Sequence, residues 1–396
     1  MKRDAVSWER AAEVCEAAQG WLRAGAIDEA THEAIREAYR DPCVTPSQVW
    51  RALTAVMTTA VILCALGAFH VAIRPSLKVL PVLFFLFATA CLVATERLEA
   101  SPRLARRGAA GATSFWGGVF VLLGLGLFLS ATAGISDDSA IDAVLLASAL
   151  VWGAGCWRWG PPLFAGFSAV SLFLFLGRFP SGRVLWVLAG AALAAVAARR
   201  LDDAAWAPSH RRAAAVLVVT GVGALYVAVN VYSLDEQLLE ELQRFSSARI
   251  APAPGRFAFI VSAVATAVLP LVVLLWAWAS RRTFLLDTGI ALLAVSLVTL
   301  RYYVHVAPLW VVLTVVGAVL VTLALAVERA LRRAPGREMA GITADALFSD
   351  EQRQQVLQVV PVVATLTPPA HSPVAVEKGL AGSGGQFGGG GASGKF

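Results

Sequence analysis

The densest group of polar and aromatic side chains beside an apolar run consists of Arg301, Tyr302, Tyr303 and His305. A guanidinium, an imidazole and two phenols can bind a phosphate or carboxylate headgroup. The same residue types also form the interfacial belts that fix the depth of a membrane helix. The sequence therefore leaves two interpretations of this cluster open, a headgroup or ligand site and an interfacial belt.

Other chemical motifs in the chain lack the context that they need. His32 and Glu33 begin an H-E-x-x-H pattern, but Arg36 stands where the second histidine would be. The segment 389–395 matches G-x-x-x-x-G-K, but Phe396 replaces the serine or threonine. The five cysteines form no C-x-x-C pair, which favours free thiols. We therefore predict no catalytic residue, no metal site and no cofactor, and we favour a non-enzymatic protein over an enzyme.

Ionisable residues avoid the centres of the apolar runs. Those nearest to the runs lie at or near run ends, where snorkelling or water can solvate them: His70, Asp142, Arg158, Asp287, Arg301 and His305. A charge at the bilayer centre costs several kcal/mol, so such residues usually mark a relay or a coupled carrier. The pattern argues against a carrier based on mid-membrane carboxylates, and it leaves open a permease for an uncharged or lipid-like solute.

Long apolar runs dominate the chain, which is 58% hydrophobic and only 15% charged. A membrane-spanning helix needs about 20 apolar residues. About ten runs meet or approach this length: Trp50–Ile73, Leu77–Thr95, Thr113–Ala133, Ala140–Trp157, Pro161–Gly177, Val184–Ala198, Ala213–Tyr232, Phe257–Ser280, Phe284–Leu300 and Val304–Val327. We therefore predict an all-α fold, a polytopic transmembrane helical bundle over residues 49–333.

Some runs depart from the pattern of one long span each. The sixth and ninth runs are short. The fourth and fifth are separated only by Arg158–Gly160, which predicts either a tight helical hairpin or a re-entrant segment. Pro270 lies inside the eighth run and is expected to kink its helix.

Positive charge alternates between the segments that connect the runs. With the N-terminus inside, the cytoplasmic segments hold most arginines: Arg97, Arg103, Arg106, Arg107, Arg199, Arg200, Arg211, Arg212, Arg281, Arg282, Arg329, Arg332 and Arg333. The net charge of +6 is therefore a topology signal, and we expect no nucleic-acid partner. This pattern predicts that both termini are cytoplasmic. The polar first fifty residues argue against a cleavable signal peptide.

The polar segments outside the bundle have distinct patterns. Residues 1–48 predict a cytosolic helical hairpin, with Gly25 ending the first helix and Asp28 capping the second. A hairpin this small must dock on the bundle, on another copy or on a partner. Residues 233–248 predict an amphipathic external helix, and 334–365 a cytosolic segment with a short helix. Residues 366–396 are rich in Pro and Gly and are expected to be disordered.

Two segments resemble known bacterial proteins. The stretch Trp21–Asp28, followed by a second helix and many spans, resembles an uncharacterised bacterial family of membrane proteins with a W-L-x-x-G-x-I-type cytosolic helical hairpin. The ending from Phe387 to Phe396 resembles the F-G-G-G-G-A-S-G-x-aromatic tail of TPM-domain and other bacterial membrane proteins. The first resemblance implies no activity. The second implies a tail whose aromatic residues, Phe387 and Phe396, bind a partner, or alternatively an inert flexible tail.

Taken together, these patterns predict a multi-pass protein of a bacterial inner membrane, in contact with the lipid bilayer. The leading hypothesis is a non-enzymatic scaffold or regulatory platform that engages a cytosolic protein through its N-terminal hairpin or C-terminal tail. One alternative is a permease for an uncharged or lipid-like solute. Another is a membrane enzyme acting on lipid headgroups near Arg301–His305. The sequence does not determine the oligomeric state.

Overall fold

The computed structural model describes most of the chain up to residue 304. The described residues are 3–304, with gaps at 24, 26, 40–47, 101–107, 202, 204–205 and 231–255. Beyond residue 304 they comprise isolated helical positions between 314 and 329 and two pairs of very short strands. The chain divides into two units, residues 1–18 with 30–304, and residues 19–29 with 305–396. The packing between helices α4 to α14 lies within the first unit.

Two helices precede the apolar part of the chain, as predicted. Helix α1 spans Arg3–Arg23 and α2 spans Glu29–Ala38. Gly25 follows α1 with a φ of +68°, and its N–H donates to the Leu22 carbonyl at 3.0 Å. This left-handed conformation ends the helix and suits glycine, which has no Cβ to clash. Cys15 on α1 is disulfide-bonded, which corrects the prediction of free thiols, whereas Cys64, Cys91 and Cys156 are free.

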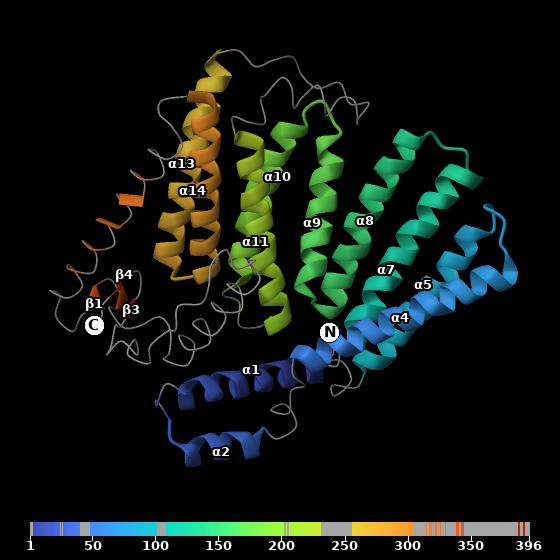
Figure 1. Cartoon of the computed structure of the whole chain (residues 1–396), viewed down its shortest axis with the longest axis horizontal. Coiled ribbons are helices and arrows are strands. Elements are labelled where there is room, and N and C mark those ends of the chain that lie inside the picture. Colours follow the sequence, from blue (N-terminus) through green and yellow to red (C-terminus); the bar gives the residue numbers. More distant parts are fainter. Residues whose placement is uncertain are drawn as a thin grey trace, which may run out of the picture. The chain divides into compact units, whose positions relative to one another are not determined.

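A series of long apolar helices follows (Figure 1). Their bounds are α4 Gln48–Ile73, α5 Leu80–Glu99, α7 Ala109–Leu127, α8 Asp137–Trp159, α9 Pro162–Gly177, α10 Gly182–Leu201, α11 Pro208–Val229, α13 Arg256–Ser280 and α14 Thr283–Val304. A π-helical turn, Phe128–Thr132, extends α7. Among the described residues, eight helices are long and apolar enough to cross a membrane, and α9 is shorter.

The predicted runs agree with these helices, with some differences. The sixth and ninth runs, which looked short, belong to α10 and α14, and both contain a segment long enough to span. The shortest is instead α9, whose 16 residues extend about 24 Å. The fourth and fifth runs form a tight hairpin, in which Gly160 has a φ of +84° and directly precedes Pro161. Most of the tenth run lies outside the described residues, so the count of ten remains a prediction.

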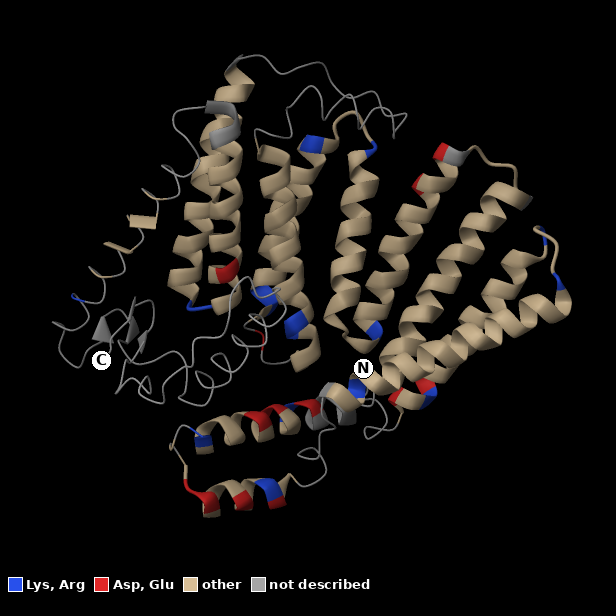
Figure 2. Cartoon of the chain, in the orientation of Figure 1, with Lys and Arg blue, Asp and Glu red and all other residues tan. Residues whose placement is uncertain are grey.

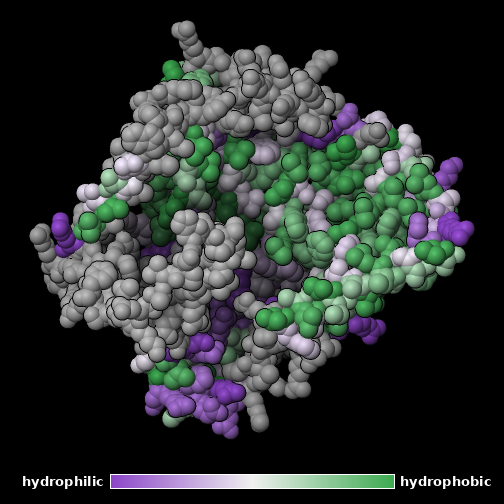
Figure 3. Space-filling model, viewed as in Figure 1, coloured by the Kyte–Doolittle hydropathy of each residue, from purple (hydrophilic) through white to green (hydrophobic). Residues whose placement is uncertain are grey.

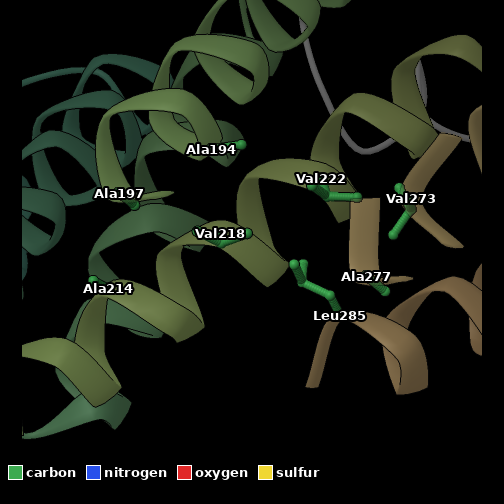
Figure 4. Close-up of a cluster of buried hydrophobic side chains, with 8 residues drawn as sticks. All are labelled: Ala194, Ala197, Ala214, Val218, Val222, Val273, Ala277 and Leu285. Carbon is green, nitrogen blue, oxygen red and sulfur yellow. The ribbon is translucent and has the colours of Figure 1, made fainter. Parts of the chain in front are cut away.

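Helices α10 and α11 pack most closely, because small residues line their contact (Figure 1). A Cβ added to Gly190 would lie 2.7 Å from the Gly221 carbonyl oxygen, and a Cβ added to Gly221 would lie 2.8 Å from that of Gly190. The two backbones therefore touch, as small residues allow in lipid. Residues from α10, α11, α13 and α14 continue this contact into a buried cluster (Figure 4): Ala194, Ala197, Ala214, Val218, Val222, Val273, Ala277 and Leu285.

Other helix pairs are also packed at glycine residues, and hydroxyl groups form hydrogen bonds between helices. Gly117 of α7 lies against Leu92 of α5, and Gly289 of α14 lies against Leu274 of α13. In the α8–α9 hairpin, the Ser168 hydroxyl donates to the Ala149 carbonyl at 2.7 Å. A hydroxyl that bonds to a neighbouring helix avoids an unsatisfied polar group in lipid.

Helix α4 is packed differently from the others. None of its most apolar 18-residue window is buried. It packs against the first part of α7, where the Trp116 indole N–H donates to the Thr59 hydroxyl at 3.2 Å. Gly108 caps α7 with a φ of +81°, and a Cβ there would lie 2.1 Å from the Arg51 carbonyl oxygen. One end of α4 is therefore held tightly, while most of its surface faces outward (Figure 3).

The second unit contains the only strands described, each two residues long. β1 Glu338–Met339 pairs antiparallel with β2 Ile342–Thr343, and β3 Phe387–Gly388 pairs antiparallel with β4 Gly391–Ala392. The pair β3–β4 lies in the tail that the sequence predicts to be disordered. The rest of that tail, the predicted short helix near residue 350 and the predicted external helix at 233–248 lie outside the described residues.

Candidate functional site

Charged residues in the described part of the chain gather at the ends of the bundle helices and along α1 and α2 (Figure 2). The most extensive group joins α1 to the beginning of α11. The Ser209 N–H donates to Oε2 of Glu9 at 3.2 Å, and Arg211 donates to Oε2 of Glu13 at 2.8 Å. Arg212 lies 3.9 Å from Glu16. We call these six residues the charge seam.

The local sequence explains why the charge seam forms. Glu9, Glu13 and Glu16 are spaced i, i+4, i+7, which places the three carboxylates on one face of α1. Pro208 is at the start of α11, so the free N–H of Ser209 and the helix dipole face the approaching carboxylates. Beside the acidic face, Ala12 and Ala18 of α1 are 5% and 1% exposed. At their exposure the ion pairs contribute about 0.2–1 kcal/mol each.

Further contacts connect the ends of other helices on the same side of the bundle, here called the α1 side. Arg158, near the end of α8, forms a bidentate pair with Glu96 near the end of α5, at 2.9 and 2.7 Å. The Trp159 indole N–H donates to the same carboxylate at 3.1 Å. Nε2 of His210, at the start of α11, lies 3.1 Å from the Trp157 carbonyl oxygen. These contacts put the ends of α5 and α8 beside the start of α11, as strict alternation of spans requires.

On the opposite side, a second arginine cluster closes the bundle. Arg178, which caps α9, donates to Asp138 of α8 at 3.1 Å and also pairs with Asp142. Arg183 of α10 donates to the Ala228 carbonyl oxygen of α11 at 2.8 Å. These arginines stabilise helix ends, because each bonds to the terminal turn of a neighbouring helix.

A buried hydrogen-bond network joins α11, α13 and α14, and its centre is Pro270. Proline has no N–H, so the carbonyl four residues earlier, at Thr266, loses its helical donor. The Ser296 hydroxyl of α14 donates to that carbonyl at 2.7 Å. The Tyr226 hydroxyl of α11 lies 2.8 Å from the Ser296 oxygen. Because the Ser296 proton is committed to the carbonyl, Tyr226 is the donor in this second bond.

The network continues to the end of α11. Ser262 donates to the Val229 carbonyl oxygen, one of the terminal carbonyls that an α-helix leaves without a helical partner. Asn230, which caps α11, donates to the Thr299 hydroxyl of α14 at 3.4 Å. Side chains of the network are at most 8% exposed: Tyr226, Asn230, Ser262, Thr266, Ser296 and Thr299. The polar groups therefore bond to one another, as the bilayer interior requires.

The site residues predicted from the sequence fall at the limits of the described part. Arg301, Tyr302 and Tyr303 are in the last turn of α14, and their side chains lie outside the description, as does all of His305. Phe387 begins β3, and Phe396 lies outside the described residues. The headgroup-site and partner-tail interpretations therefore remain predictions.

The charge seam and the Pro270 network were missed by the sequence reasoning, although each has a sequence signal. The acidic spacing of Glu9, Glu13 and Glu16 is visible in the sequence, but it does not identify the partner helix. Pro270 identifies Thr266 as the carbonyl that needs a donor, but not Ser296 as its source. Arg211 and Arg212 were interpreted only as topology signals.

The fold defines a class: a multi-pass α-helical membrane protein with a helical N-terminal segment. The chain matches no protein-family model, no curated protein and no solved structure.

Proposed function

We propose that the protein is a non-enzymatic platform of a bacterial inner membrane, with both termini in the cytoplasm, that presents its N-terminal helices to a cytosolic protein partner. The charge seam is the observation that carries this proposal. It anchors α1 through three acidic residues to the start of α11. Helix α2 has no buried residue and is therefore available for binding. The resemblance of Trp21–Asp28 to an uncharacterised bacterial family with a W-L-x-x-G-x-I-type helical hairpin would agree with such a role.

The charge pattern supports the orientation. Among the described residues, Arg97, Arg158, Arg199, Arg200, Arg211 and Arg212 all lie at helix ends on the α1 side. Segments rich in arginine remain in the cytoplasm. The N-terminus then shares that compartment, because α1 contacts the start of α11. A cytoplasmic C-terminus follows if the tenth run spans, and the tail with Phe387 and Phe396 is a second element for partner binding.

The proposal is tested by breaking and restoring the charge seam. Glu13→Arg places two positive charges together and should release α1, and the added exchange Arg211→Glu should restore attraction with the charges reversed. A photo-crosslinking amino acid at Ala34 of α2, in living cells, reports the partner. We expect one crosslinked product for the native protein, its loss with Glu13→Arg, and its recovery in the double exchange. An unchanged product across all three proteins would refute a role for α1 docking.

The permease hypothesis has one observation in its favour: Pro270 removes one helical hydrogen bond of the continuous helix α13 beside buried polar groups. Broken helices can mark transport sites. The hydrogen bonds of that network are satisfied internally, which favours a structural role. Uptake of a neutral solute into proteoliposomes distinguishes the two, because a platform predicts no uptake above that of empty vesicles. The headgroup-enzyme hypothesis depends on Arg301–His305, and loss of phospholipid turnover on Arg301→Gln would support it.

A further inference from the structure

An apolar groove lies where α4 separates from the rest of the bundle. It has a volume of about 280 Å³ and is lined by residues of α4, α5 and α7: Trp50, Leu53, Thr54, Met57, Thr58, Leu98 and Ala109. The volume is near the lower limit of ordinary ligand pockets, about 300 Å³. Such a groove suits a narrow hydrocarbon chain better than a bulky solute.

The groove lies beside the first turns of α4, which are held by α7. Gly108 brings the first part of α7 against the Arg51 carbonyl, and Trp116 holds Thr59 further along. Near the groove α4 packs on α7, and it meets α5 farther along, where the Phe69 and Phe87 rings lie 5.5 Å apart. The lining side chains Trp50 and Met57 therefore remain 52% and 59% exposed. In a bilayer, a surface of this kind contacts lipid tails.

Two arginines are sequence neighbours of lining residues at the end of the groove on the α1 side. Arg51 directly follows the lining residue Trp50, and Arg97 directly precedes the lining residue Leu98. Both are exposed, and neither forms an ion pair with a described residue. The nearby Glu96 is engaged by Arg158. Two guanidinium groups without an ion pair to a described residue, placed at headgroup level, attract a phosphate, and Trp50 suits the same depth.

We propose that this groove binds one anionic phospholipid of the leaflet on the α1 side, with an acyl chain between α4 and α5 and its phosphate at Arg51 and Arg97. The apolar lining selects the hydrocarbon chain. The two arginines select a lipid with a net negative charge, and a zwitterionic lipid has no net charge. The bound lipid fills the space that α4 leaves open, so it completes the packing of this helix.

Native mass spectrometry of the full chain, purified in detergent and mixed with phosphatidylglycerol or phosphatidylcholine, tests the proposal. We expect one retained phosphatidylglycerol and a clear preference for it. Each basic residue near a membrane surface contributes about five-fold to the affinity for anionic lipid. Arg51→Gln with Arg97→Gln should therefore reduce the preference about 25-fold. Arg74→Gln, at the other end of α4, is the matched control and should retain it.

A second variant blocks the groove without changing charge. Ala109→Leu places a larger side chain in the lining and should remove retention of the lipid. Val61→Leu, on an exposed part of α4 outside the groove, is its control. Equal retention of the two lipids by the native protein would overturn the proposal, as would unchanged retention in Ala109→Leu. A mass corresponding to two protein chains in place of protein plus lipid would assign the groove to a second copy and overturn it as well.

Discussion

Helices α4 and α11 have similar lengths and similar mean hydropathy, yet they lie in opposite environments. Of the most apolar 18-residue window, 44% is buried in α11 and none in α4. Both contain glycine, but Gly221 of α11 meets the backbone of α10, whereas a Cβ on Gly67 of α4 would meet nothing within 4 Å. Hydropathy thus identifies a helix as membrane-spanning, and the small residues of its partner determine whether it is buried.

The largest expected effect is at the glycine contact of α11. Gly221→Val would place its Cβ 2.8 Å from the Gly190 carbonyl oxygen, which belongs to backbone and cannot rotate away. Overpacking of this kind costs about 1–3 kcal/mol, and more where backbone must move. Gly223→Val is the matched control, because a Cβ at Gly223 meets nothing within 4 Å. Thermal unfolding in detergent should show a lower Tm for the first variant alone, and equal values would contradict the close contact.

The second largest effect is expected in the Pro270 network, which joins α11, α13 and α14 and does not involve α4. Ser296→Ala leaves the buried Thr266 carbonyl without a donor, at a cost of about 1–3 kcal/mol in the free energy of unfolding. Pro270→Ala supplies a backbone N–H for the same carbonyl. We therefore expect Ser296→Ala to cost clearly less in the Pro270→Ala background, as measured by a double-mutant cycle in denaturant. Additive costs would show that Ser296 does not compensate for the missing proline N–H.

These two regions also show how much can be predicted from the sequence. Apolar run length located the spanning helices because the bilayer constrains length directly. Run length did not identify the shortest helix. Gly182 and Arg199 extend α10 beyond its apolar run, and Thr283 extends α14 in the same way. The boundary between α1 and α2 was predicted from Gly25 and Asp28, because helix caps depend on local sequence. The charge seam and the Ser296 bond were not predicted, because each depends on which distant helix becomes a neighbour.

A smaller effect tests how α4 is held. Gly108→Ala introduces a Cβ at a positive φ and against the Arg51 carbonyl, with a conformational cost of about 1–2 kcal/mol. Gly111→Ala is the control, with open space around its Cβ. Hydrogen exchange followed by mass spectrometry should show faster exchange in 49–73 for Gly108→Ala, with α10 and α11 unchanged. Uniform acceleration across the bundle would mean that α4 is not an independently held element.

The smallest effect is expected for a valine-to-alanine substitution, made once in α11 and once in α4. Val218 of α11 is fully buried and Val61 of α4 is 69% exposed. Because lipid tails are as apolar as the valine side chain, only lost packing matters, and Val218→Ala should cost about 1 kcal/mol. Val61→Ala should stay within about 0.5 kcal/mol of the native protein. Equal losses in Tm would imply that α4 is covered by protein, for example by a second copy.

The charge seam is tested most directly by carbodiimide coupling, which joins a carboxylate to an amine only when they touch. The native lysines are only Lys2, Lys78, Lys378 and Lys395, so an introduced lysine is easily traced. In native membranes, Arg211→Lys should yield a Glu13 amide within a single chain, identified by peptide mass spectrometry. Arg199→Lys, at the end of α10, should yield little. Equal coupling at positions 199 and 211, or coupling only between two chains, would contradict the docking of α1 on α11.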